Sequence, residues 1–114
     1  MGATNDMNGD QTESPWVAAA PEAELAEGAL RLVCPAGVEV CLVRQDGEVF
    51  AVGAWCSHAR ASLAEGDLMP GAIMCPLHGA RFDLRTGRHF GLPAVRGIPV
   101  YPVKVENGTI WVRV

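Results

Sequence analysis

The sequence has no long apolar run and no positive charge near its start. None of its 114 residues belongs to an uncharged apolar stretch of about 18 residues, the length that a membrane-spanning helix needs. The first basic residue is Arg31, whereas secretory and twin-arginine signals place positive charge ahead of an apolar run. We therefore expect no membrane association and no export, and we predict a cytoplasmic location.

Clustered positive charge is also missing. Residues 1–30 carry six Asp or Glu and no Lys or Arg, while residues 31–114 carry seven acidic against nine basic residues. Affinity for nucleic acid depends on several phosphate contacts from clustered Lys and Arg. The slight positive excess after residue 30 is too weak for this, so we exclude nucleic acid as a partner.

The first 15 residues contain almost nothing that a core could bury. A segment of this kind cannot offset the entropy lost on ordering. We predict a flexible acidic tail over residues 1–15 and one folded domain over residues 16–114, because this length suits a single small domain.

The folded part has the texture of an antiparallel all-β protein. Asp46-Gly47 and Asn107-Gly108 are dipeptides that tolerate the positive φ angles of tight hairpins. From Ala18 to Glu27, good helix formers predict a turn or two of helix at most. Short apolar runs between Gly, Pro and Asp predict strands at Leu30–Val33, Val38–Arg44, Glu48–Val52, Ile73–Cys75, Arg81–Leu84, Tyr101–Glu106 and Thr109–Val112.

Two short units of cysteine and histidine carry the chemistry. They are Cys56-Ser57-His58 and Cys75-Pro76-Leu77-His78, followed by Gly79. Two thiolates and two neutral imidazoles at these spacings can converge on one centre from two short turns, which predicts a metal or cluster site. Such a donor set suits tetrahedral zinc or an iron–sulfur centre. Zinc sites more often pair Cys-x-x-Cys with His-x₃₋₅-His, whereas in Rieske centres two His replace two Cys on one iron of a [2Fe–2S] cluster.

Residues 55–87 resemble the Rieske [2Fe–2S] ferredoxins, soluble electron carriers of bacterial ring-hydroxylating dioxygenase systems. The resemblance rests on Trp-Cys-Ser-His-Ala-Arg-Ala and on Cys-Pro-Leu-His-Gly-Ala-Arg-Phe-Asp-Leu-Arg-Thr-Gly. It continues through Gly91-Leu92-Pro93 and later short segments, and so spans roughly residues 28–114. It implies a Rieske fold, with a small β-sandwich base and a cluster-binding subdomain of two ligand loops.

By the same resemblance, Cys56 and Cys75 hold the buried iron, and His58 and His78 hold the outer iron. Gly91-Leu92-Pro93 then corresponds to a third loop that covers the cluster. Respiratory Rieske proteins carry a bracing disulfide where this chain has Ala61 and Leu77, so no such disulfide can form here.

The two side chains that donate hydrogen bonds to the cluster in respiratory Rieske proteins are also missing. They are a Ser and a Tyr, and this chain has Ala80 and Phe82 in their places. Hydrogen bonds to the sulfurs raise the potential. We therefore expect a potential at the low end of the Rieske range of roughly −150 to +300 mV.

Several other residues have plainer interpretations. We interpret Cys34 and Cys41 as small packing residues and His89 as a solvated residue after a turn. Trp55, Phe82 and Phe90 are expected in the core or as shields of the cluster. Positive charge around the loops is expected from Arg60, Arg81, Arg85 and Arg88.

Three functions remain open at this point. The first is a monomeric one-electron carrier, not itself an enzyme, between a flavin-containing NAD(P)H ferredoxin reductase and a terminal ring-hydroxylating oxygenase. The second is the Rieske-like small subunit of a larger oxidoreductase such as assimilatory nitrite reductase, and the third is a zinc-bound interaction module. For the carrier we expect docking at the end that carries His58 and His78, with Arg60, Ala61, Leu77, Arg81 and the Gly91-Leu92-Pro93 loop on its rim. A self-sufficient oxygenase is excluded, since mononuclear iron needs two further His and a carboxylate, and His89 alone is left.

Overall fold

The computed structural model describes residues 15–57, 60–77, 79–90 and 96–114. Of the predicted features, His58, His78, the Gly91-Leu92-Pro93 loop and nearly all of the acidic tail lie outside these ranges. Within them, no helix has the length and apolarity needed to cross a membrane. The strands are β1 (Val17–Pro21), β2 (Leu30–Val33), β3 (Val40–Gln45), β4 (Glu48–Gly53), β5 (Asp67–Met69), β6 (Ala72–Met74), β7 (Arg81–Asp83), β8 (His89–Phe90), β9 (Val100–Tyr101), β10 (Val103–Glu106) and β11 (Thr109–Val112), with 3-10 turns η2 (Glu22–Glu24), η3 (Pro35–Gly37) and η4 (Leu63–Glu65).

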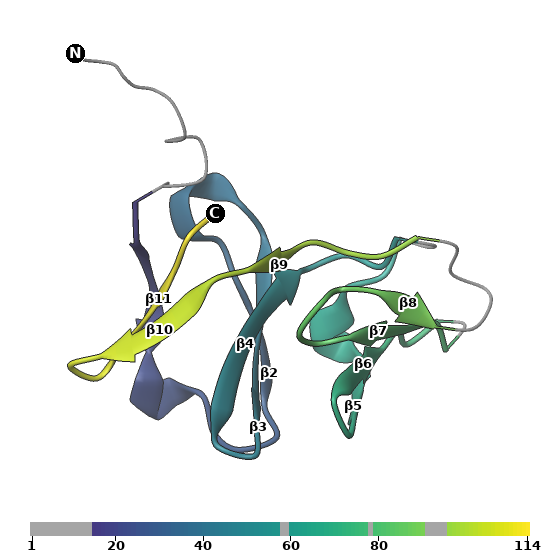
Figure 1. The fold of residues 1–114 in the computed structure, drawn as a ribbon, viewed down its shortest axis with the longest axis horizontal. Helices are drawn as coiled ribbons and strands as arrows, with labels where there is room; N and C mark the ends of the chain where they lie inside the picture. Colours follow the sequence, from purple (N-terminus) through teal and green to yellow (C-terminus); the bar gives the residue numbers. More distant parts are fainter. Residues whose placement is uncertain (1–14, 58–59, 78, 91–95) are drawn as a thin grey trace, which may run out of the picture.

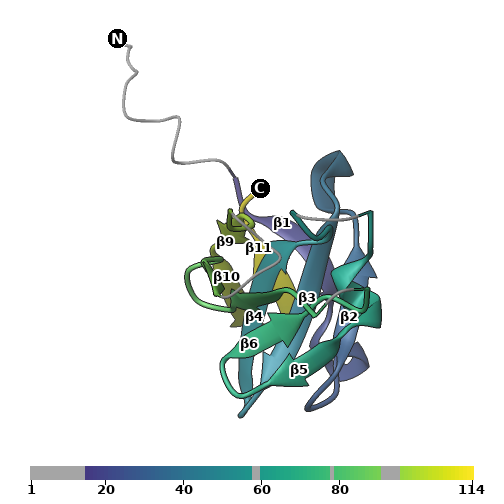
Figure 2. The ribbon, with the colours of Figure 1, turned by 90° about the vertical axis from the view of Figure 1, so that its right-hand side faces the viewer.

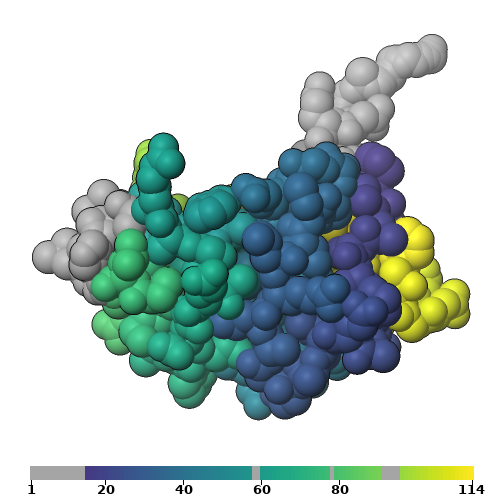
Figure 3. Space-filling view, turned by 180° about the vertical axis from the view of Figure 1, so that it is seen from behind, coloured from purple at the N-terminus to yellow at the C-terminus, as the bar shows by residue number. Residues whose placement is uncertain are grey.

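These strands form three antiparallel sheets. We name them the terminal sheet (β1-β11-β10), the central sheet (β2-β3-β4-β9) and the distal sheet (β5-β6-β7-β8). Figure 1 shows them in this order along the long axis, and from behind, Figure 3 shows the first and last strands at one end and the distal sheet at the other. The predicted all-β antiparallel fold with a sandwich base and a separate subdomain is confirmed.

Strand β3 of the central sheet is covered on both faces, which explains why it begins with four apolar residues in a row. Val40, Cys41, Leu42 and Val43 are all fully buried. Because successive side chains point to opposite faces, Val40 and Leu42 join the core with the terminal sheet, while Cys41 and Val43 join the core with the distal sheet. In Figure 2 the distal sheet lies directly in front of the central sheet.

Both predicted hairpin turns are confirmed. Asp46 and Gly47, between β3 and β4, have φ angles of 55° and 77°, and Asn107 and Gly108, between β10 and β11, have 52° and 77°. Two successive positive φ angles are those of the type I′ turn, whose twist matches that of the strands it joins.

The segment Ala18–Glu27 is the main difference from the predicted elements. Its first part is β1, in which Ala18 lies opposite Trp111 and Pro21 opposite Thr109, and only Glu22–Glu24 form a 3-10 turn. Pairing with β11 overrides the helix propensity of three alanines, because tertiary context decides such weak preferences. Pro102 separates β9 from β10 within the predicted strand Tyr101–Glu106, since proline cannot donate to a ladder.

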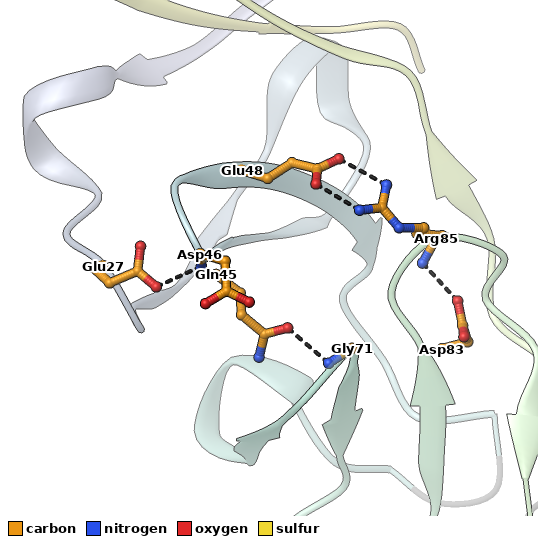
Figure 4. Close-up of polar contacts among 7 residues, drawn as sticks. All are labelled: Glu27, Gln45, Asp46, Glu48, Gly71, Asp83 and Arg85. Carbon is orange, nitrogen blue, oxygen red and sulfur yellow. Dashed lines mark hydrogen bonds and ion pairs between the residues drawn. The ribbon is translucent and has the colours of Figure 1, made fainter.

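A polar brace joins the β3–β4 hairpin to the distal sheet (Figure 4). The Gln45 side-chain amide donates to the Met69 carbonyl at 2.8 Å, and the Gly71 N–H donates to its Oε1 at 2.8 Å. Arg85 donates to both Glu48 carboxylate oxygens, at 2.6 and 2.8 Å, and its guanidinium lies 5.2 Å from the Phe50 ring centroid. The brace holds the distal sheet on the base at the turns of β5–β6 and β7–β8.

We expect Gln45→Ala to destabilise the protein by roughly 1–3 kcal/mol, because it removes two hydrogen bonds worth about 0.5–1.5 kcal/mol each. The measurement is thermal unfolding of the cluster-loaded protein. Glu24→Gln is the control, since it breaks an exposed ion pair with Arg31 that does not join two sheets, and such pairs contribute little. Equal melting temperatures for the two variants would show that the hydrogen bonds of Gln45 do not stabilise the protein.

Candidate iron–sulfur site

The first predicted ligand loop is the tip of a hairpin that leaves the central sheet. The Cys56 N–H donates to the Ala61 carbonyl at 3.0 Å, and the Leu63 N–H donates to the Ala54 carbonyl at 2.8 Å. Between these bonds, Trp55 and Ser62 form an antiparallel bridge. The two arms of the hairpin are therefore paired through their backbones up to Cys56 and Ala61, where the loop begins.

The second ligand loop is built in the same way on β6 and β7. Met74 lies opposite Arg81 in the ladder, and the Cys75 N–H donates to the Ala80 carbonyl at 2.7 Å. Gly79 has a φ of 76° and donates its N–H to the Cys75 carbonyl at 3.3 Å. This left-handed position favours glycine, which explains why Gly79 follows the predicted ligand in the sequence.

The two hairpins are thus equivalent around their cysteines. In each, the cysteine N–H donates to the carbonyl of an alanine five residues later, and the loop between them contains the predicted histidine position. Cys56 and Cys75 are buried, with 7% and 2% exposure, and both belong to one core with Phe82. Sequence spacing predicted two ligand turns, and in the structure the cysteines of both turns belong to the same buried core.

Two further contacts hold the hairpins in place, and no sequence pattern predicts either of them. The Ser57 hydroxyl donates to the Arg96 carbonyl at 2.6 Å, which ties the first loop to the chain just before β9. Gly66 lies so close to the second hairpin that a Cβ there would collide with the Met74 carbonyl. Any larger residue at position 66 would push β5 away from β6.

The other two predicted ligands, His58 and His78, lie outside the described ranges. Within those ranges, no three Cys, His, Asp or Glu side chains gather into a possible metal site. The residues that are described fit a cluster that takes two thiolates from one side, because Cys56 and Cys75 enter one buried core from equivalent hairpins.

The remaining cysteines differ from this pair and from each other. Cys41 is fully buried in the core between the central and distal sheets, and burial raises the pKa of its thiol to about 12. Its predicted packing role is confirmed. Cys34 is exposed after β2 and takes no part in a disulfide, so it does not pack as expected.

We expect a thiol-specific alkylating agent to modify Cys34 rapidly in the native cluster-loaded protein and to leave Cys41 unmodified. Only the thiolate reacts, and at neutral pH a thiol with a pKa of about 12 is almost entirely protonated as well as inaccessible. Mass spectrometry of peptides after brief labelling makes the measurement. Labelling of Cys41 at a rate similar to that of Cys34 would contradict its placement in the core.

Of the two roles expected for the three aromatic side chains, a place in the core is confirmed for Phe82 alone, and His89 is less solvated than expected. Phe82 is fully buried as expected, but Trp55 and Phe90 are surface residues, 47% and 39% exposed. Trp55 lies on a hairpin that projects from the sheet, and Phe90 ends the edge strand β8. His89 is a half-buried strand residue opposite Phe82.

The predicted positive set around the loops is also smaller than expected. Arg85 lies beyond the end of β7 away from the ligand loop and binds Glu48 of the base. Arg81 is half-buried at the loop end of β7, with its guanidinium 5.5 Å from the Phe90 ring centroid. Ala61, predicted on the docking rim, is 7% exposed, and its carbonyl accepts the Cys56 N–H. Arg60 and Leu77 remain exposed beside the ligand loops.

Comparison with known proteins decides the kind of centre. The family model described as the Rieske [2Fe–2S] domain matches residues 15–102. The chain belongs to the Rieske [2Fe–2S] domain family. The predicted cofactor, a Rieske-type [2Fe–2S] cluster, is thereby confirmed, and the zinc module is excluded.

Several of the matched relatives are ferredoxins of similar length. The chain is 45% identical, over 80% of its length and 87% of the relative, to the 3-phenylpropionate/cinnamic acid dioxygenase ferredoxin subunit of Photorhabdus laumondii. It matches the ferredoxin of carbazole 1,9a-dioxygenase from Nocardioides aromaticivorans IC177 with a TM-score of 0.82 and 37% identity, covering 88% of this chain and 98% of that one.

A related ferredoxin has also been solved in a complex with its oxygenase. The structure is that of the reduced oxygenase and oxidised ferredoxin in carbazole 1,9a-dioxygenase. It matches with a TM-score of 0.79 and 29% identity, over 86% of this chain and 92% of that one. These relatives are named as ferredoxins of dioxygenase systems, in agreement with the predicted role as an electron-transfer component rather than an enzyme.

Proposed function

We propose that this chain is a soluble, monomeric Rieske ferredoxin that carries single electrons to a terminal ring-hydroxylating oxygenase. The observation that carries the proposal is the pair of equivalent hairpins that bring Cys56 and Cys75 into one core, in a chain of the Rieske family. The chain spans nearly the whole length of the ferredoxins that it matches, which favours a separate carrier over a subunit of a larger enzyme.

In this proposal four residues hold the cluster. Cys56 and Cys75 bind the inner iron as thiolates, and their burial supports this because it keeps the anionic ligands away from solvent. His58 and His78 bind the outer iron through one ring nitrogen each, as their positions shortly after the single cysteine of each loop favour. The bound cluster supplies reversible one-electron chemistry, while the hairpins fix its ligands.

The electron donor is proposed to be a flavin-containing NAD(P)H ferredoxin reductase, and the location the cytoplasm. An exposed thiol at Cys34 fits a reducing compartment, where surface cysteines persist as thiols. Two pockets among the described residues, of about 380 and 210 Å³, lie at the surface and are open to solvent.

The direct test is analysis of the protein purified from iron-replete cells. We expect two irons and two acid-labile sulfides per chain, negligible zinc, and a reduced-state electron paramagnetic resonance signal with a low average g value, typical of mixed His and Cys ligation. Dithionite-reduced protein should then reduce a terminal oxygenase of a related system. A colourless protein saturated with zinc would contradict the proposal.

Charge at the ligand-loop end should govern how fast partners meet the ferredoxin. Arg60 is exposed and forms no ion pair with any residue in the described ranges. We expect Arg60→Glu to leave the visible spectrum unchanged and to slow electron transfer in a salt-dependent way, because rim charges act mainly on encounter rates. Stopped-flow transfer rates at low and high ionic strength make the measurement.

Arg88→Glu is the matched control for this prediction. Arg88 is exposed too, but it lies just before β8, at the end of the distal sheet away from the ligand loops. It undergoes the same change of charge, so a general electrostatic effect would slow both variants equally. Such an equal effect would remove Arg60 from the docking surface.

A further inference from the structure

A groove of about 380 Å³ lies between the two ligand hairpins. One wall comes from the first hairpin, where Trp55 directly precedes Cys56, and the other from the second, where Pro76 and Leu77 follow Cys75. Trp55 is 47% and Leu77 57% exposed. Exposed large apolar side chains that gather in one place mark interaction sites, whereas scattered ones do not.

The indole of Trp55 is held in place from outside the groove. Its Nε1–H donates to the Glu39 carboxylate at 2.7 Å, and Glu39 directly precedes β3 of the central sheet. The ring is thereby tied to the base of the molecule as well as to the hairpin that carries it. An aromatic side chain with its polar edge satisfied offers a fixed apolar face at low entropic cost.

The rim of the groove carries one charge of each sign, Arg60 and Glu65. Neither forms an ion pair among the residues that the structure describes. Apolar side chains with a few charged ones at their border are the usual composition of a protein interface. The groove therefore suits an apolar side chain of a protein surface better than a charged small molecule.

We propose that this groove receives an apolar side chain from the docking surface of the terminal oxygenase. Trp55 and Leu77 are the contact residues, and Glu39 is a positioning residue that sets the indole. The inference rests on the proposed carrier function. The groove is continuous with the ligand loops, so a partner seated in it lies within a few bonds of Cys56, and the oxygenase is the partner seen in complex with a related ferredoxin.

The contact residues are tested with cluster-loaded protein, reduced and mixed with purified terminal oxygenases of the carbazole and 3-phenylpropionate systems. We expect Trp55→Ala and Leu77→Ala each to raise the ferredoxin concentration for half-maximal rate roughly tenfold, the effect of losing a central interface residue, with little change in the saturating rate. Leu32→Ala is the matched control, a leucine with 44% exposure on β2 of the central sheet. Visible spectrum and potential should match the parent in all three.

The positioning role is tested at high ionic strength, where the charge of Glu39 is screened. Glu39→Ala and Trp55→Phe, which each remove the hydrogen bond, should raise the half-maximal concentration several-fold. Glu39→Gln keeps an acceptor oxygen and should stay near the parent value. If Glu39→Ala also stayed there, Glu39 would have no positioning role.

The remaining outcomes separate the inference from the function on which it rests. Parent-like behaviour of Trp55→Ala and Leu77→Ala would overturn the groove as a contact site. If these variants slowed only reduction by a flavin reductase, the occupant would be the reductase and the inference would be wrong. If the parent protein itself reduced no oxygenase, the proposed carrier function would fail first and the inference with it.

Discussion

Cys56→Ser and Cys75→Ser will each yield a colourless protein with almost no bound iron. A neutral hydroxyl cannot replace an anionic thiolate as an iron ligand, and both cysteines enter the same core from equivalent hairpins. Iron and sulfide analysis and the visible spectrum make the measurement. Each parent thiol is proposed as a ligand, so loss of either one should be enough.

The same variants should also be much less stable. Binding of a structural metal centre contributes directly to folding free energy, because the site does not exist in the unfolded chain. We expect a fall in melting temperature of roughly 10 °C or more, since 1 kcal/mol shifts a domain of this size by about 4–8 °C.

Cys41→Ser is the informative control for both effects. Cys41 lies in the same buried core as the proposed ligands, so its replacement also places a hydroxyl among apolar groups and costs stability. It should nevertheless keep its colour and two irons per chain. Cys34→Ser, at the surface, should change neither property. Loss of colour in Cys41→Ser, or full colour in Cys75→Ser, would contradict the ligand assignment.

Strands and turns whose conformation depends on neighbouring residues could be predicted from the sequence. The two type I′ turns at Asp46-Gly47 and Asn107-Gly108 follow from residues that tolerate positive φ, and β2 and β11 have the bounds that their apolar runs predict. The strand β1 could not be predicted in this way. Its alanines favour a helix, and only pairing with β11, far along the chain, makes them a strand.

The same division applies to the candidate site. The short spacing between cysteine and histidine, from Cys56 and from Cys75, predicted two similar turns, because such spacing is a local property of the sequence. The roles of Glu39 and Gly66 depend on approaches between separate segments, to Trp55 and to Met74, that no local pattern encodes. The hydrogen bond from Gln45 to the Met69 carbonyl could not be predicted either, because it also joins separate segments.

Ala80→Ser and Phe82→Tyr together will raise the reduction potential on the order of 100 mV. Both parent side chains are fully buried in the core that holds Cys56 and Cys75, and neither carries a hydrogen-bond donor. A donor at each position would bond more strongly to the reduced, more negative cluster. A difference of about 1.4 kcal/mol per bond corresponds to about 59 mV for one electron.

Stability provides an independent check on where the new hydroxyls point. Position 82 is fully buried, so a tyrosine hydroxyl there without a partner would cost about 1–3 kcal/mol. If it bonds to the cluster, the potential rises and that cost is largely recovered. Phe50→Tyr adds the same hydroxyl to β4 beside Arg85 and should leave the potential unchanged. Protein-film voltammetry at neutral pH measures the parent, the double variant and Phe50→Tyr. A parent potential already near the upper end of the Rieske range, or a double variant with the same potential as the parent, would show that Ala80 and Phe82 do not set the potential.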